Sequence, residues 1–416
     1  MTTAAKSTGI ASTQRMPHGR SRRPGLVPWS LMLLACAAAG AAARSGAPAP
    51  AQTAPSADYD AMATDTARVL AGLAPGDAAR FDAVTKRPAW RAYRDDVDRK
   101  WSQLQKERFS VMRAWSDREV APAAGPCDTL LYPFGGPDLI NAYVLFPGCS
   151  RYLLFGLEPV GSMPALVGMG PQALDTLLAE LRASLSDVFV RDYFITREMM
   201  TELKTPGVNG TLPLLLVFLA RVDARLVDIR MESPWALGEP ALNAEQAPGP
   251  SASAARRQPQ KTAAVTIRFT VPGSTRIQTL TYARVRMEDP EFVKQEALLA
   301  YLQRHAPFTT LLKSASYLLH DNQFAKVRGV VLTGSRAVLQ DDTGVPFRFF
   351  DTSAWNIRLF GRYSPPVNDF NYGRQPDLEA AYRAAAAVRD LPFAFGYHWR
   401  QGTSSVMLAI RTAGVR

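Results

Sequence analysis

The sequence is poor in histidine and cysteine, and it lacks the motifs that identify the common enzyme classes. Its 416 residues include four histidines and three cysteines. It contains no Gly-x-Ser-x-Gly, Ser-x-x-Lys, His-Glu-x-x-His or Gly-Lys-Ser/Thr signature, which argues against the usual serine-hydrolase, metalloprotease and phosphate-loop sites. Gly168–Ala173 fits a dinucleotide-binding pattern, but a loop that leads into a helix at Pro171 explains these residues better. No cofactor is expected.

The sequence also lacks clustered positive charge and long apolar runs. Its net charge of +11 comes from scattered residues, and five of these charges lie in the first 36 residues, which leaves +6 for the rest. This distribution argues against nucleic-acid partners and a polybasic membrane patch. No window reaches the roughly 20 uncharged apolar residues of a membrane-spanning helix.

The first 43 residues have the pattern of a secretory leader. Basic residues precede the apolar run Leu26–Ala35, and small residues follow it. The basic residues nearest to this run begin after Met16, so Met16 is an alternative start. The Pro- and Ala-rich residues 44–57 indicate a disordered tether.

The leader allows two kinds of processing. Ala41–Ala43 fits an ordinary cleavage site, whereas Leu33–Cys36 is similar to a lipobox, in which the Cys36 thiol would carry lipid. The first predicts a soluble periplasmic protein and the second a lipoprotein attached to the membrane by a lipid anchor. Both place the chain in the cell envelope.

Cys127 and Cys149 remain as an even pair, 22 residues apart. In an oxidising compartment such a pair predicts a disulfide bond. Two free buried thiols are the alternative. A catalytic thiol is disfavoured because no histidine lies near either cysteine in the sequence.

Hydrophobic periodicity predicts an α+β fold with a mainly antiparallel mixed sheet, flanking helices and an N-terminal helical segment. The helical segment spans 58–120 and packs on an α+β domain at 121–416, which a disordered insert interrupts at about 236–262. The expected strands are 129–134, 142–146, 152–157, 214–220, 226–231, 265–271, 279–287, 337–340, 345–350, 393–397 and 406–410. Further helices are expected from 171, from 290 to about 305, at about 309–320 and at 377–388.

Two carboxylates, Asp138 and Glu158, each follow a predicted strand among glycine and proline. They are expected at one edge of the sheet, where paired carboxylates support acid–base chemistry or cation binding. The alternative is that both are exposed turn residues.

His320, Asp341 and Asp342 are weaker candidates for the same chemistry, because a helix end and a hairpin turn would also explain them. Lys313 and Ser314 could form an activated hydroxyl. However, adjacent residues on the helix expected at 309–320 would point to different faces.

Five segments resemble an uncharacterised family of exported bacterial proteins. They are YPFGGPD (132–138), LFGLEPVG (154–161), LLKSASYLLH (311–320), LQDDTGVPFRFF (339–350) and LFGRYSPP (359–366). The resemblance covers roughly residues 60–416 outside the insert. The family has no established activity, so the resemblance implies an exported fold of one unit and no mechanism.

The sequence therefore predicts an exported envelope protein of unknown biochemical function, soluble or lipid-anchored. The favoured hypothesis is a non-catalytic component that binds a small molecule or an envelope component. The alternative is an envelope hydrolase with a carboxylate and histidine site, which could be metal-assisted.

Overall fold

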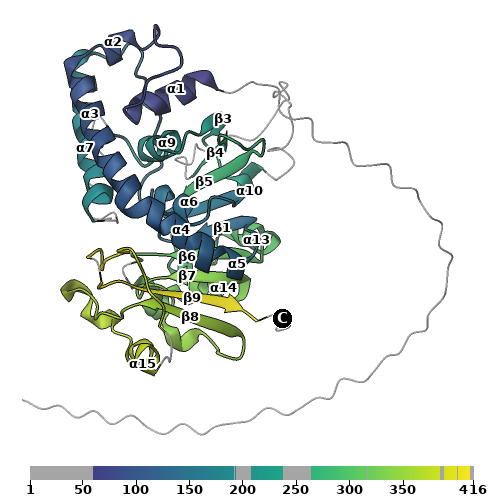
Figure 1. Cartoon of the computed structure of the whole chain (residues 1–416). Coiled ribbons are helices and arrows are strands. Elements are labelled where there is room, and N and C mark those ends of the chain that lie inside the picture. The colour runs from purple at the N-terminus through teal and green to yellow at the C-terminus, as the bar shows by residue number, and fades with distance from the viewer. Residues whose placement is uncertain are drawn as a thin grey trace, which may run out of the picture. The chain divides into compact units, whose positions relative to one another are not determined.

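The structure is a computed structural model that describes residues 60–191, 193, 208–237, 264–315, 317–384, 388–400 and 402–412. All of these belong to one unit that spans 54–416 (Figure 1). The predicted leader at 1–43, the tether at 44–57, the lipidation site Cys36 and all but two residues of the insert lie outside the described residues.

Nine strands in the described part of the chain form one sheet in the order β3-β4-β5-β2-β1-β6-β7-β9-β8. Figure 1 shows this sheet with β3 at the top and β8 at the bottom. The strands are β1 (Thr129–Tyr132), β2 (Arg151–Gly156), β3 (Arg225–Arg230), β4 (Ala264–Thr270), β5 (Gln278–Arg284), β6 (Phe308–Leu312), β7 (Ser335–Gln340), β8 (Trp355–Gly361) and β9 (Ser405–Arg411). An α+β fold with a mixed sheet and flanking helices is thus confirmed.

The centre of this sheet is parallel, whereas both of its sides are antiparallel. Strands β5, β2, β1, β6 and β7 run in one direction. The ribbon β3–β4 pairs antiparallel with β5, and β9 runs antiparallel to both β7 and β8. The expected majority of antiparallel pairs is not reached, because four of the eight strand pairs are parallel.

Helices bury both faces of the parallel centre. Along β1, Leu130 and Tyr132 belong to one hydrophobic core, and Leu131 belongs to the other. The first core also holds residues of α1 (Ala61–Leu70), α3 (Pro88–Leu104), α4 (Ser110–Glu119), α6 (Leu139–Leu145), α7 (Pro171–Val190) and α9 (Leu212–Arg221). The second holds residues of α12 (Asp289–Phe292), α13 (Glu296–Arg304), α14 (Ala325–Gly334) and α15 (Pro376–Ala384). Burial on both faces explains why successive residues of β1, such as Leu130 and Leu131, are both apolar.

The N-terminal helical segment is largely as predicted. Besides α1, α3 and α4 it contains the short helices α2 (Asp82–Thr85) and α5 (Ala121–Ala124), and a π-helical turn at Gln105–Phe109 joins α3 to α4. The aromatic stripe of Trp90, Tyr93, Trp101 and Trp115 is buried in the first core. These aromatic side chains therefore pack the fold, as the amphipathic pattern indicated.

Two predicted strands, 142–146 and 214–220, are wrong. The first lies mostly in α6 and the second in α9, in which each residue up to Ala220 is buried. Asp138 caps α6 by accepting a hydrogen bond from the backbone of Asn141, and Pro213 lies in the first turn of α9. Helices buried all round show no 3.6-residue pattern, so an apolar run cannot distinguish them from buried strands.

The helix predicted at about 309–320 is also wrong, because residues 308–312 form β6. The predicted strands at 345–350 and 393–397 are likewise not formed. Residues Phe347–Phe349 form a 3-10 turn, and Phe395 makes only an isolated bridge to His398. The carboxyl end of β7 therefore leads into a loop rather than a hairpin.

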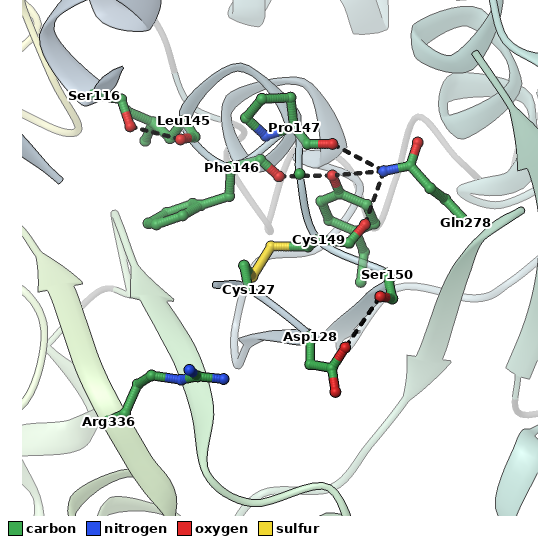
Figure 2. The surroundings of a disulfide bond; sticks show 12 residues. Ser116, Cys127, Asp128, Leu145, Phe146, Pro147, Cys149, Ser150, Gln278 and Arg336 are labelled. Carbon is green, nitrogen blue, oxygen red and sulfur yellow. Dashed lines mark hydrogen bonds between the residues drawn. A yellow bond between two sulfur atoms is a disulfide. The ribbon is translucent and has the colours of Figure 1, made fainter. Parts of the chain in front are cut away.

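The disulfide predicted between Cys127 and Cys149 is present, with the two Cα atoms 4.5 Å apart (Figure 2). It joins the residues just before β1 and β2, at the amino ends of these strands. Beside it, the Gln278 side chain donates to the Pro147 and Cys149 carbonyls at 2.9 and 2.8 Å. These bonds fix the loop between α6 and β2.

Within the described residues, no helix combines the length and the hydrophobicity that crossing a membrane requires.

Candidate functional site

Five segments meet at one edge of the sheet, namely 132–138, 154–161, 311–320, 339–350 and 359–366. They end β1, β2, β6, β7 and β8, and the pairing pattern points the carboxyl ends of these strands in one direction. The expected common edge for Asp138 and Glu158 is therefore confirmed. The disulfide lies at the opposite edge.

A pocket opens at this carboxyl edge, where the order of the strands reverses. From β1 the chain continues to β2 on one side, whereas β6 leads to β7 on the other. Ligands of open parallel sheets bind in the crevice at such a switch point. The pocket is small, with a cavity volume of about 30 Å³. The loops after β1 and β6 form most of its lining, which includes Phe134, Asp138, Glu158, Tyr193, Lys313 and Ser314.

Asp138 and Lys313 form a buried ion pair across the switch point. Their Oδ2 and Nζ atoms are 2.8 Å apart, and the two side chains are 5% and 1% exposed. Asp138 also accepts hydrogen bonds from the Tyr132 hydroxyl and from the Asn141 amide, both at 2.9 Å. A buried charge needs this degree of compensation, because its transfer out of water costs several kcal/mol.

Glu158 is buried in the same pocket beside two glycines. Its Oε2 accepts the Leu157 N–H at 3.1 Å and lies 3.3 Å from the Tyr282 hydroxyl. A Cβ at Gly136 would lie 3.4 Å from this oxygen, and one at Gly156 would collide with it. The glycines after β1 and at the end of β2 therefore make room for the carboxylate.

Asp341 and Asp342 follow β7 and are also buried. Asp341 accepts the Ser314 N–H at 3.0 Å, and from Thr343 it accepts the N–H at 3.0 Å and the hydroxyl at 2.6 Å. Burial, with the neighbouring Asp342 charge, raises the pKa of Asp341 to about 6. Asp342 accepts the Tyr317 hydroxyl at 2.6 Å.

The pKa values of the two histidines near this pair of aspartates are shifted in opposite directions. Burial, with the nearby Arg348 charge, lowers the pKa of His320 to about 4, so this ring is neutral at pH 7. Burial opposes protonation of His398, but its Asp342 partner outweighs burial and raises the His398 pKa. The His398 Nε2 lies 3.7 Å from Asp342 Oδ1, which is within ion-pair range but too long for a hydrogen bond.

Three residues around the site have left-handed backbone conformations. Phe134, Ser314 and Tyr317 have φ angles of 59°, 53° and 60°. This conformation is strained for residues other than glycine, and such strain concentrates at functional sites. Phe134 and Ser314 line the pocket itself.

The sequence predicts the carboxylates of this edge but not the residues that face them. Asp138 and Glu158 line the pocket, whereas Asp341 lies behind it and accepts the N–H of the lining residue Ser314. His320 and Asp342 do not line it. The sequence does not predict Lys313 and Ser314 as a pair, because the helix expected at 309–320 would point them to different faces. The β-branched pair Thr309-Thr310 was the signal for a strand.

In the described part of the chain, no group of three or more His, Cys, Asp or Glu side chains is placed to hold a metal ion. Comparison of the chain with protein-family models, curated proteins and solved structures finds no match.

The depressed pKa of His320 gives stability a pH dependence. His320 binds a proton less tightly in the folded state than in the unfolded state. Its contribution to the free energy of unfolding is therefore fully present above pH 6.5 and is lost as the pH falls toward 4. Between pH 8 and pH 5 the loss amounts to about 2 kcal/mol. In the His320→Gln variant this loss of unfolding free energy between pH 8 and pH 5 should be absent. Urea unfolding of the wild type and the variant at both pH values measures it. Equal pH dependence in the variant and the wild type would contradict the assignment.

Proposed function

We propose that this protein is exported to the cell envelope and binds a small polar molecule in the pocket at the switch point. The observation that carries the binding proposal is the buried Asp138–Lys313 ion pair, which lines the pocket at the carboxyl ends of β1 and β6. Convergent charged groups in a concave site at a switch point are typical of ligand sites. The strained Phe134 and Ser314 on either side of the pocket add support.

Two features support export. The sequence begins with a leader pattern, and the Cys127–Cys149 disulfide suits an oxidising compartment. If Cys36 carries lipid, labelled palmitate should enter the wild type but not a Cys36→Ala variant. Equal incorporation in both would exclude lipidation at Cys36.

Native mass spectrometry tests the binding proposal. The wild type is mixed with the small-molecule fraction of an envelope extract, beside the double variant Asp138→Asn/Lys313→Met. We expect a ligand-bound species in the wild type only, because the double variant removes both charges but keeps the shape of the pocket. Equal ligand-bound fractions in the two proteins would contradict the proposal.

An envelope hydrolase is the second candidate, and one observation favours it. Asp341, hydrogen-bonded to the pocket residue Ser314, has a pKa raised to about 6, which suits proton transfer near neutral pH. Turnover of chromogenic carboxylic and phosphate esters, lost in Asp341→Asn, would support this candidate. Ligand binding without turnover of any ester would leave a binding protein.

A further inference from the structure

Ser314 has three properties that a purely structural serine does not need. It lines the pocket, its φ is 53°, and its Oγ is buried without a hydrogen-bond partner among the described residues. Glycine would adopt this backbone conformation without strain, and buried hydroxyls are normally hydrogen-bonded. The side chain therefore costs stability in two ways, which points to a use other than folding.

The Asp341 carboxylate is hydrogen-bonded to the backbone of Ser314, although not to its hydroxyl. The Ser314 N–H donates to Asp341 Oδ2 at 3.0 Å. The side chains of Ser314 and Asp341 also both lie near Gly396, whose φ is 61°. A Cβ at Gly396 would lie 3.4 Å from Ser314 Oγ and would overlap Asp341 Oδ2. The absence of a side chain at Gly396 thus leaves room beside both oxygens.

We propose that Ser314 is a nucleophile and Asp341 its general base, and that together they attack an acyl ester bound in the pocket. This inference rests on the second candidate of the proposed function, the hydrolase, and names its reaction and substrate class. Asp341 is suited to the role because its raised pKa of about 6 leaves it ionised, yet basic enough to accept a proton, near neutral pH.

The reaction balances without a cofactor. Ser314 Oγ forms a bond to the acyl carbon while its proton passes to Asp341 Oδ2. The bond from the acyl carbon to the alcohol oxygen then breaks, and Asp341 returns the proton to the departing alkoxide. Water attacks the acyl-serine, gives a proton to Asp341 and releases the carboxylic acid, and this proton restores the Ser314 hydroxyl.

Lys313 supplies the positive charge that this reaction needs. Lys313 directly precedes Ser314 in the sequence and lines the same pocket. Its ammonium group lies 2.8 Å from the Asp138 carboxylate. A fixed cation beside the reacting carbonyl stabilises the negative oxygen of the tetrahedral intermediate, the more so where water is excluded.

A fluorophosphonate probe tests this inference on the whole chain with its disulfide intact. The probe forms a covalent bond to an activated serine oxygen and releases fluoride, and peptide mass spectrometry locates the adduct. We expect the adduct on Ser314. Ser353 is the matched control, because its hydroxyl donates to Asp351 at 2.8 Å in an exposed loop outside the pocket. It should stay unlabelled.

Three variants separate activation of the hydroxyl from folding. Ser314→Gly removes the hydroxyl and the backbone strain, so it should melt at or above the wild-type temperature and give no adduct. Asp341→Asn should slow labelling of Ser314 by about 100-fold. If Asp341→Asn does not fold, Asp341→Glu, which moves the carboxylate by one methylene, should slow it at least about tenfold.

Two results would overturn the inference. The first is a folded wild-type protein without an adduct on Ser314, and the second is labelling of Ser314 that is undiminished in the folded Asp341 variant. Either failure is distinguishable from failure of the binding proposal. The probe reacts with the hydroxyl without the natural ligand, whereas the native mass measurement follows the ligand and depends on the Asp138–Lys313 pair.

Discussion

Replacing Lys313 by methionine is expected to lower the free energy of unfolding by about 3 to 5 kcal/mol, because it leaves the buried Asp138 carboxylate without its counter-charge. Asp138→Asn in the same chain should recover most of this loss. Asparagine is neutral, still caps α6 and has nearly the shape of aspartate. Urea unfolding of the wild type, the two single variants and the double variant gives the coupling energy directly.

The matched control is the exposed pair Lys294–Glu291, whose charged atoms are 2.7 Å apart, nearly the same distance. Its side chains are 66% and 37% exposed, so Lys294→Met should change stability little. Additive losses from the two single variants at Asp138 and Lys313 would contradict the account of the pair. A loss at Lys294 as large as that at Lys313 would contradict it as well.

Removing the disulfide with Cys127→Ser/Cys149→Ser is expected to lower the free energy of unfolding by about 3 kcal/mol. The bond closes a loop with a sequence separation of 22 and so restricts the unfolded chain. Ligand binding should persist, because the disulfide lies at the amino ends of β1 and β2 and the pocket lies at their carboxyl ends. Denaturant unfolding of the oxidised wild type and the double variant measures the loss.

Reductant provides the control for the disulfide. It should destabilise the wild type by about the same amount, roughly 3 kcal/mol, and should leave the double variant unchanged. An equal response of both proteins to reductant would show that the bond does not carry this stability.

The pattern of the sequence predicts those elements of the fold that have a polar face or are bounded by clear turn residues. The aromatic stripe of α3 and α4 alternates with charged residues, and the ribbon β4–β5 encloses the turn Pro272-Gly273, so both were assigned correctly. Elements buried on every side carry no such periodicity. The local pattern therefore predicts strands where α6 and α9 form, and a helix where β6 forms.

These errors of assignment also decided what could be known of the site. The turn chemistry around Asp138 and Glu158 was enough to place both carboxylates at one edge of a sheet. Lys313 and Ser314 could not be added, because their position depends on β6 pairing in parallel with β1, a contact between segments about 180 residues apart. Such pairing follows from the fold as a whole and not from local pattern.

Hydrogen–deuterium exchange tests the central claim, that the ligand occupies the carboxyl edge of the sheet, most directly. The wild type is compared with and without the small-molecule fraction that yields a bound species. The account predicts slower exchange in peptides that cover 132–138, 156–161 and 312–318, and no change around the disulfide at 147–151. Protection confined to other segments, or none in these three at saturation, would contradict the account.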